Sequence, residues 1–138
     1  MTIDLKGPLG SYSSYDEFQV DRTLIWIKIS PHGERESWLT QGKFLFDEIW
    51  AAVPEALRIA EQVSRNLCSD FWDRCDSKQA SGQPLAVWGI WINPETGNAS
   101  YDININHHFQ SDHDDLPDLP EESIGVIRNR EGRLKIEA

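Results

Sequence analysis

A short segment in the last third of the chain gathers the side chains most able to do chemistry. Residues 107–115 read His-His-Phe-Gln-Ser-Asp-His-Asp-Asp and hold three imidazoles and three carboxylates. These groups are the usual protein ligands of zinc and other divalent metals. One hypothesis is therefore a small metal-dependent enzyme, and the residues it would use are His107, His108, Asp112 and His113.

The spacing within this segment argues against a metal site. Adjacent strand residues point to opposite faces, so His107 and His108 can share an ion only if the preceding strand has already ended. The sequence contains no H-E-x-x-H, C-x-x-C or EF-hand pattern, and no P-loop or G-x-S-x-G motif. We therefore expect no metal, no cofactor and no catalytic residues, and we expect that the protein is not an enzyme.

The two cysteines indicate a structural role and a reducing compartment. Cys68 and Cys75 are seven residues apart. If one helix runs through both, a rise of 1.5 Å per residue separates them by about 10 Å, which is beyond disulfide reach. A chain that begins at Met1 with so few cysteines is typical of the cytoplasm, where we expect the protein to be.

Composition excludes several classes of protein. The 138 residues include 13 Lys or Arg and 23 Asp or Glu, for a net charge of −10, which disfavours nucleic-acid binding. No run approaches the ~18 apolar residues that span a bilayer, so we expect no membrane partner. Six tryptophans and 39% hydrophobic residues are too many for a disordered acidic tail. We expect a single domain over residues 1–138, with residues 1–20 as a loosely structured lead-in.

Much of the negative charge is concentrated in one loop. Pro117 and Pro120 stiffen this loop, which lowers the entropy lost when its carboxylates are held by a partner. A fixed negative patch steers a basic partner and accelerates association. The alternative is an ordinary solvated surface, as most charge runs are. The six acidic residues are Asp112, Asp114, Asp115, Asp118, Glu121 and Glu122.

Tryptophans on two predicted strands form a second candidate surface. In the strand at 23–29 three isoleucines share one face, which leaves Trp26 on the other. Trp88 and Trp91 have opposite parity on another strand, so one of them also faces away from the helix. Aromatic side chains beside Asp102 would form a mixed surface of the kind that anchors partners. The alternative is that these aromatics pack across strands or under the N-terminal segment.

The spacing of apolar residues predicts the elements that position these groups. Strands are indicated by period-two stretches rich in β-branched and aromatic residues, and one helical turn is expected at 15–18. Loops are expected at 76–84 and 110–122. The predicted strands are 23–29, a returning 36–40, 86–92, 100–106, 124–128 and 133–137.

One stretch has helical rather than strand periodicity. From 44 to 71 apolar residues recur every three or four positions. Pro54 cannot donate to the helical ladder, so we expect a break near Val53. The order of elements predicts an α+β fold, with an antiparallel sheet of about five to six strands and one long amphipathic helix packed on one face.

This layout resembles the YezG-like antitoxins, immunity proteins of bacterial polymorphic toxin systems. Their order is two strands, a long amphipathic helix, a Trp-containing strand, a Gly-bearing turn, and a strand with tyrosine and acidic residues. The prolines, the His107–His108 pair and the final hairpin depart from it, and no site residue is transferred. The matching stretches here are 23–29, 44–71, 87–92 (Val-Trp-Gly-Ile-Trp-Ile), Gly97 and 100–105.

The resemblance and the acidic charge together predict an immunity protein, an antitoxin that binds and neutralises a cognate bacterial toxin. Because many nucleases are basic, a basic nuclease toxin is the expected partner, bound through an acidic surface by a monomer or homodimer. A structural subunit that dimerises through an open sheet edge is a further possibility. The expected partner-binding residues are Asp112, Asp114, Asp115, Asp118, Glu121, Glu122, Trp26, Trp88 and Asp102.

Overall fold

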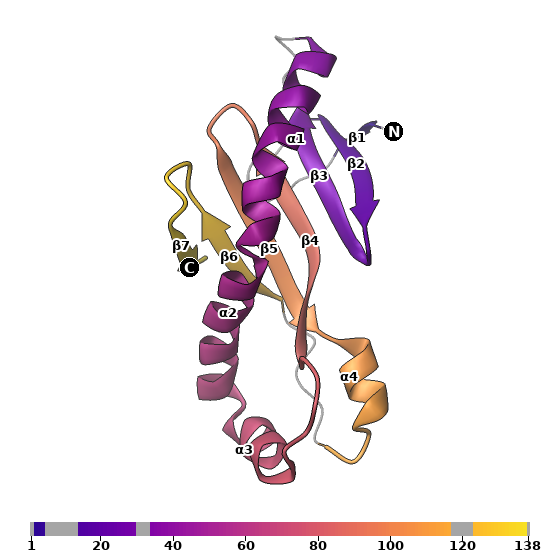
Figure 1. The fold of residues 1–138 in the computed structure, drawn as a ribbon, viewed down its shortest axis with the longest axis vertical. Coiled ribbons are helices and arrows are strands. Elements are labelled where there is room, and N and C mark those ends of the chain that lie inside the picture. The colour runs from indigo at the N-terminus through magenta and orange to yellow at the C-terminus, as the bar shows by residue number, and fades with distance from the viewer. Residues whose placement is uncertain (1, 5–13, 30–33, 117–122, 138) are drawn as a thin grey trace.

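The fold is α+β, with helices packed on one face of a twisted sheet (Figure 1). The computed structural model describes residues 2–4, 14–29, 34–116 and 123–137. The four helices of this part of the chain are α1 (Arg35–Ala51), α2 (Val53–Leu67), α3 (Ser69–Lys78) and α4 (His107–Asp112). Its strands are β1 (Thr2–Asp4), β2 (Ser14–Val20), β3 (Thr23–Ile29), β4 (Leu85–Asn93), β5 (Asn98–Ile105), β6 (Ile124–Arg128) and β7 (Leu134–Ile136).

The described strands form one seven-stranded sheet in which spatial order follows chain order. Every neighbouring pair is antiparallel except β3 and β4, which are parallel. The expectation of a purely antiparallel sheet was therefore wrong at its centre. The reason is the crossover, because α1, α2 and α3 carry the chain over one face and return it in the same direction (Figure 1).

The single long helix is replaced by three. The helical break expected near Val53 is confirmed at Ala52, and Pro54 lies in the first turn of α2, where its missing N–H costs nothing. A second break at Cys68 separates α2 from α3, so no continuous helix joins the cysteines. The strand predicted at 36–40 was wrong, since these residues belong to α1. Five residues are too few to distinguish a strand from a helix by periodicity.

Two further expectations near the chain's loops were wrong. The helical turn at 15–18 is part of β2, and Val20 pairs with Thr23 across a two-residue turn. Asp21 adopts φ +53° in this turn, a left-handed conformation that aspartate tolerates. The segment expected to be a loosely structured lead-in therefore includes two strands, β1 and β2. The loop expected from Asp76 starts later, because α3 continues to Lys78.

The core lies between the sheet and its helices. Ile25, Ile27 and Ile29 of β3 are buried on the helix side, as expected. A side chain at Gly42 of α1 would place a Cβ 2.5 Å from Ile27 Cγ2, so glycine allows the helix to lie close to the sheet. Tyr101 of β5 donates from its hydroxyl to the Ile49 carbonyl of α1 at 2.6 Å. These contacts fix α1 on one face of the sheet.

Candidate functional site

The tryptophans of β3 and β4 stack on the sheet face opposite the helices. Trp26 and Trp91 are in register, with ring centroids 4.2 Å apart and planes at 22°. A Cβ on Gly89 would lie 2.4 Å from Trp26 Cζ3, so the indole rests directly over this glycine. Both indole Nε1 atoms are buried without a hydrogen-bond acceptor among the described residues. Trp26 therefore packs against a neighbouring strand. This was the alternative to its expected role as an anchor for a partner.

A β-bulge in β4 sets the orientation of Trp88. Val87 pairs with Ile103 and Gly89 with the next residue, Asp102, so Trp88 is the extra residue of β4. The Thr23 hydroxyl donates to the Val87 carbonyl at 2.9 Å and satisfies the backbone at this irregularity. The bulge puts both Trp88 and Trp91 on the face away from the helices, so the parity argument was wrong.

Trp88 is the most exposed tryptophan among the described residues, and it lies beside a cavity. Its side chain is 37% exposed, and its Nε1 donates to the Ile105 carbonyl at 2.9 Å. The His107 ring lies 5.2 Å from the indole, centroid to centroid, at 41°. We call the adjoining cavity of about 400 Å³ the Trp88 pocket. It is lined by Arg22, Leu24, Ala86, Val87, Trp88, Asn106, His107 and His108.

Asn106 positions α4 and thus the histidines of this pocket. Its side-chain oxygen accepts from the His108 backbone N–H at 3.1 Å, which caps the helix. Its amide nitrogen donates to the Gln83 carbonyl at 2.8 Å and ties the cap to the segment before β4. Because His107 and His108 begin a helix rather than end a strand, the opposite-face argument does not apply to them.

The third histidine of the cluster points elsewhere. The His113 ring packs 4.4 Å from the Phe109 ring, centroid to centroid, and its Nε2 lies 2.9 Å from the Ser81 carbonyl. In the ranges 2–4, 14–29, 34–116 and 123–137, no three His, Cys, Asp or Glu side chains come together to hold a metal ion. His113 therefore does not line the Trp88 pocket with His107 and His108.

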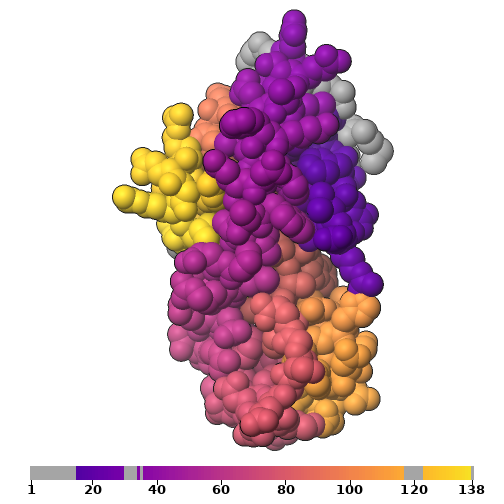
Figure 2. Space-filling view, in the orientation of Figure 1, coloured from indigo at the N-terminus to yellow at the C-terminus, as the bar shows by residue number. Residues whose placement is uncertain are grey.

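Three of the acidic candidates lie at the end of α4 or just after it, and Figure 2 shows α3 and α4 together at one end of the molecule. Asp112 ends α4, and Asp114 and Asp115 follow it; all three are exposed. Asp115 forms an ion pair with Lys78 of α3, whereas Asp112 and Asp114 make none with the described residues. The remaining acidic candidates lie outside the described residues, namely Asp118, Glu121 and Glu122.

Asp102 lies on the same sheet face as the tryptophans. It pairs with Gly89 on one side and Gly125 on the other, so its neighbours in the register carry no side chain. It lines a shallow hollow with Trp91 and Glu137 rather than the Trp88 pocket. Asp102 thus lies beside Trp91 of the stacked pair and does not line the Trp88 pocket.

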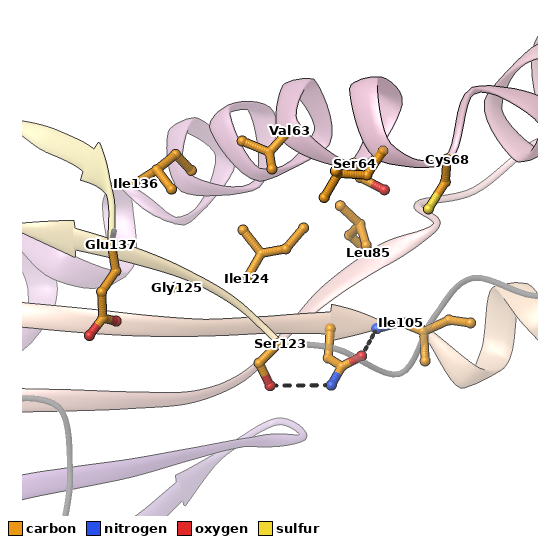
Figure 3. Close-up of a pocket in the computed structure, with 12 residues that line it drawn as sticks. Val63, Ser64, Cys68, Leu85, Ile105, Ser123, Ile124, Gly125, Ile136 and Glu137 are labelled. Atoms are coloured by element: carbon orange, nitrogen blue, oxygen red, sulfur yellow. Dashed lines mark hydrogen bonds between the residues drawn. The ribbon is translucent and has the colours of Figure 1, made fainter.

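A cleft between α2 and the last strands was missed at the sequence level (Figure 3). Its volume is about 320 Å³, and Val63, Ile124 and Ile136 make much of its wall apolar. The polar groups near it bond to each other: Trp72 Nε1 donates to Ser64 Oγ at 2.8 Å, and Asn104 Nδ2 to Ser123 Oγ at 3.4 Å. Only the assembled fold joins its walls, so no local sequence signal marks it.

Three titratable groups, two buried and one exposed, have pKa values shifted by burial or by a hydrogen bond. Burial raises the pKa of Tyr101 to about 12. Burial also raises the pKa of the Cys75 thiol, which keeps it protonated and unreactive. A hydrogen bond from Arg65 lowers the pKa of Asp76, and this ion pair joins α2 to α3. The Tyr101 and Asp76 contacts hold elements together, and Cys75 is a buried thiol, which agrees with a structural role for this cysteine.

Comparison with known proteins adds no further assignment. In the part of the chain that the structure describes, no helix is long and apolar enough to cross a membrane. No protein-family model, curated protein or solved structure matches the chain.

Proposed function

We propose that this protein is an immunity protein that binds a cognate bacterial toxin and neutralises it by occupying its surface. The observation that carries the proposal is the placement of an exposed, fixed tryptophan next to a short helix whose C-terminal end carries exposed carboxylates without an ion pair among the described residues. Trp88 contacts His107 at the start of α4, and Asp112 closes the same helix. Five residues of helical rise separate these two ends by about 8 Å, well within one protein interface.

The carboxylates at the C-terminal end of α4 favour a basic partner. Asp112 and Asp114 are exposed and make no ion pair with the described residues, so they are available to lysine or arginine of another protein. The whole chain adds a long-range contribution through its net charge of −10. Such complementarity accelerates association with basic proteins and repels anionic ones. A basic nuclease is the class of toxin that fits this charge.

Trp88 is the aromatic anchor of the proposed interface. Its hydrogen bond to Ile105 holds the indole in one orientation before binding, so little side-chain entropy is lost on association. Tryptophan is also among the residues that most often dominate binding free energy. Trp26 stacks on Trp91, so we do not propose it as a second anchor.

The proposal is tested by co-expression with the toxin encoded beside this protein's gene. The complex is captured through a tag on the toxin, and its dissociation constant is then measured. Asp112→Lys with Asp114→Lys is expected to weaken binding at least about tenfold, mainly through slower association. Asp115 is left intact because its reversal would also break the Lys78 pair.

A matched control separates local from overall charge. Glu36→Lys with Asp47→Lys makes the same charge change at two exposed positions of α1, away from α4 (Figure 1). This control is expected to retain nearly full affinity. If the toxin bound the wild-type protein and the Asp112/Asp114 variant with equal affinity, the proposal that these two carboxylates contact the toxin would be overturned.

A further inference from the structure

The Trp88 pocket has a local charge opposite to that of the protein. None of its eight lining residues is acidic, although the chain carries a net charge of −10. Arg22 lines the pocket and forms no ion pair with the described residues, and exposed His108 lines it as well. An acidic protein that keeps carboxylates out of one pocket and leaves a cation there offers a site for a negative group.

The same pocket offers a flat aromatic surface. The Trp88 indole is 37% exposed and held by its hydrogen bond to the Ile105 carbonyl. The tilted ring of His107 lies beside it, and Leu24 adds an apolar contact from β3. A planar ring stacked on the indole would bury apolar area without any rearrangement of the tryptophan.

The backbone is shaped to present this surface. The bulge at Val87–Gly89 turns Trp88 to the outer face, and bulges of this kind commonly re-aim a side chain at a functional site. Arg22 comes from the two-residue turn between β2 and β3, and the histidines come from α4. Three separate parts of the chain thus meet at a cavity of about 400 Å³, a size typical of small-ligand sites.

We propose that the Trp88 pocket binds a small planar aromatic molecule that carries a negative group. Its ring stacks on Trp88, and its anionic group binds Arg22 with the exposed imidazole of His108. An aromatic carboxylate and a nucleoside monophosphate share this chemistry. The inference does not rest on the proposed toxin binding, because it concerns the isolated protein.

The test is calorimetric titration of the full purified chain with four probes. Indole-3-carboxylate and adenosine monophosphate carry both required features. Indole-3-carboxamide lacks the charge, and cyclohexanecarboxylate lacks the planar ring. At least one anionic aromatic probe is expected to bind with a submillimolar dissociation constant, and which one binds identifies the source of the ligand. The matched probe that lacks charge or ring is expected to bind at least about tenfold more weakly.

Three variants locate the binding. Trp88→Leu and Arg22→Gln are each expected to weaken it at least about tenfold. Arg74→Gln removes an exposed arginine of α3 outside the pocket and is expected to have no effect. If Trp88→Leu does not fold, the chemical-shift change of the Trp88 indole N–H in the wild-type protein reports binding instead. Absence of submillimolar binding by both anionic aromatics, or unchanged affinity in Arg22→Gln, would overturn the proposal.

Discussion

Trp26 and Trp91 stack across two adjacent parallel strands, with their ring centroids 4.2 Å apart. The two residues come from segments separated by three helices, so the stack joins the N-terminal hairpin to the rest of the sheet. Gly89 provides the space in which the Trp26 ring lies. The stack explains why two tryptophans of the outer face are structural, whereas Trp88 at the bulge remains 37% exposed.

Replacement of Trp26 is expected to lower the free energy of unfolding more than replacement of Trp88. Trp26→Ala removes the stack and should lower the free energy of unfolding by about 3 kcal/mol. Trp88→Ala loses one hydrogen bond and partial burial and should cost only about 1 kcal/mol. Urea denaturation of both variants measures the difference. Equal losses for the two variants would contradict the assignment of Trp26 to the fold and Trp88 to the surface.

Gly42 is expected to be a point at which helix propensity and packing oppose each other. Alanine is better than glycine in a helix interior by about 1 kcal/mol. Its Cβ, however, would overlap Ile27, which is fully buried and cannot move aside freely. Overpacking of a core costs about 1–3 kcal/mol, so Gly42→Ala should be destabilising overall. Thermal unfolding checks this, and a raised melting temperature would show that α1 can shift from the sheet.

The Tyr101 hydroxyl is expected to make stability depend on pH in the alkaline range. Burial raises the folded-state pKa to about 12, above the unfolded value of about 10. The folded state therefore favours the neutral phenol, and this contribution is present below pH ~10 and lost as pH rises towards ~12. Tyr101→Phe should remove this part of the alkaline loss while costing about 1 kcal/mol at neutral pH, since the bond to Ile49 disappears.

Denaturation measured at several alkaline pH values distinguishes the two proteins. The wild-type curve should fall more steeply than that of Tyr101→Phe between pH 10 and 12. Parallel curves would show that Tyr101 ionises without cost to the fold.

The strands were predictable where the local pattern was complete. The bounds of β3 and β6 agree with the expected 23–29 and 124–128, because each run of β-branched residues is closed by turn residues. The break at Ala52 followed from Pro54 alone. In contrast, the parallel pairing of β3 and β4 depends on how three helices cross the sheet, and no local pattern encodes that path.

The site was predictable in its residues but not in its geometry. His107, His108 and Trp88 were all singled out, yet their meeting depends on the bulge at Val87–Gly89, which a period-two count cannot show. Arg22 was missed because a lone arginine in a short turn carries no motif. The Lys78–Asp115 pair likewise joins residues 37 positions apart, so only the fold shows which acids remain available.

The central claim is tested most directly by growth rescue in bacteria. The product of the adjacent gene is expressed from an inducible promoter, with or without this protein. The account predicts that the neighbouring protein alone stops growth, that wild-type protein restores it, and that the Asp112→Lys, Asp114→Lys variant does not while the Glu36→Lys, Asp47→Lys control does. Growth arrest that persists in the presence of equal amounts of folded wild-type protein would contradict the account.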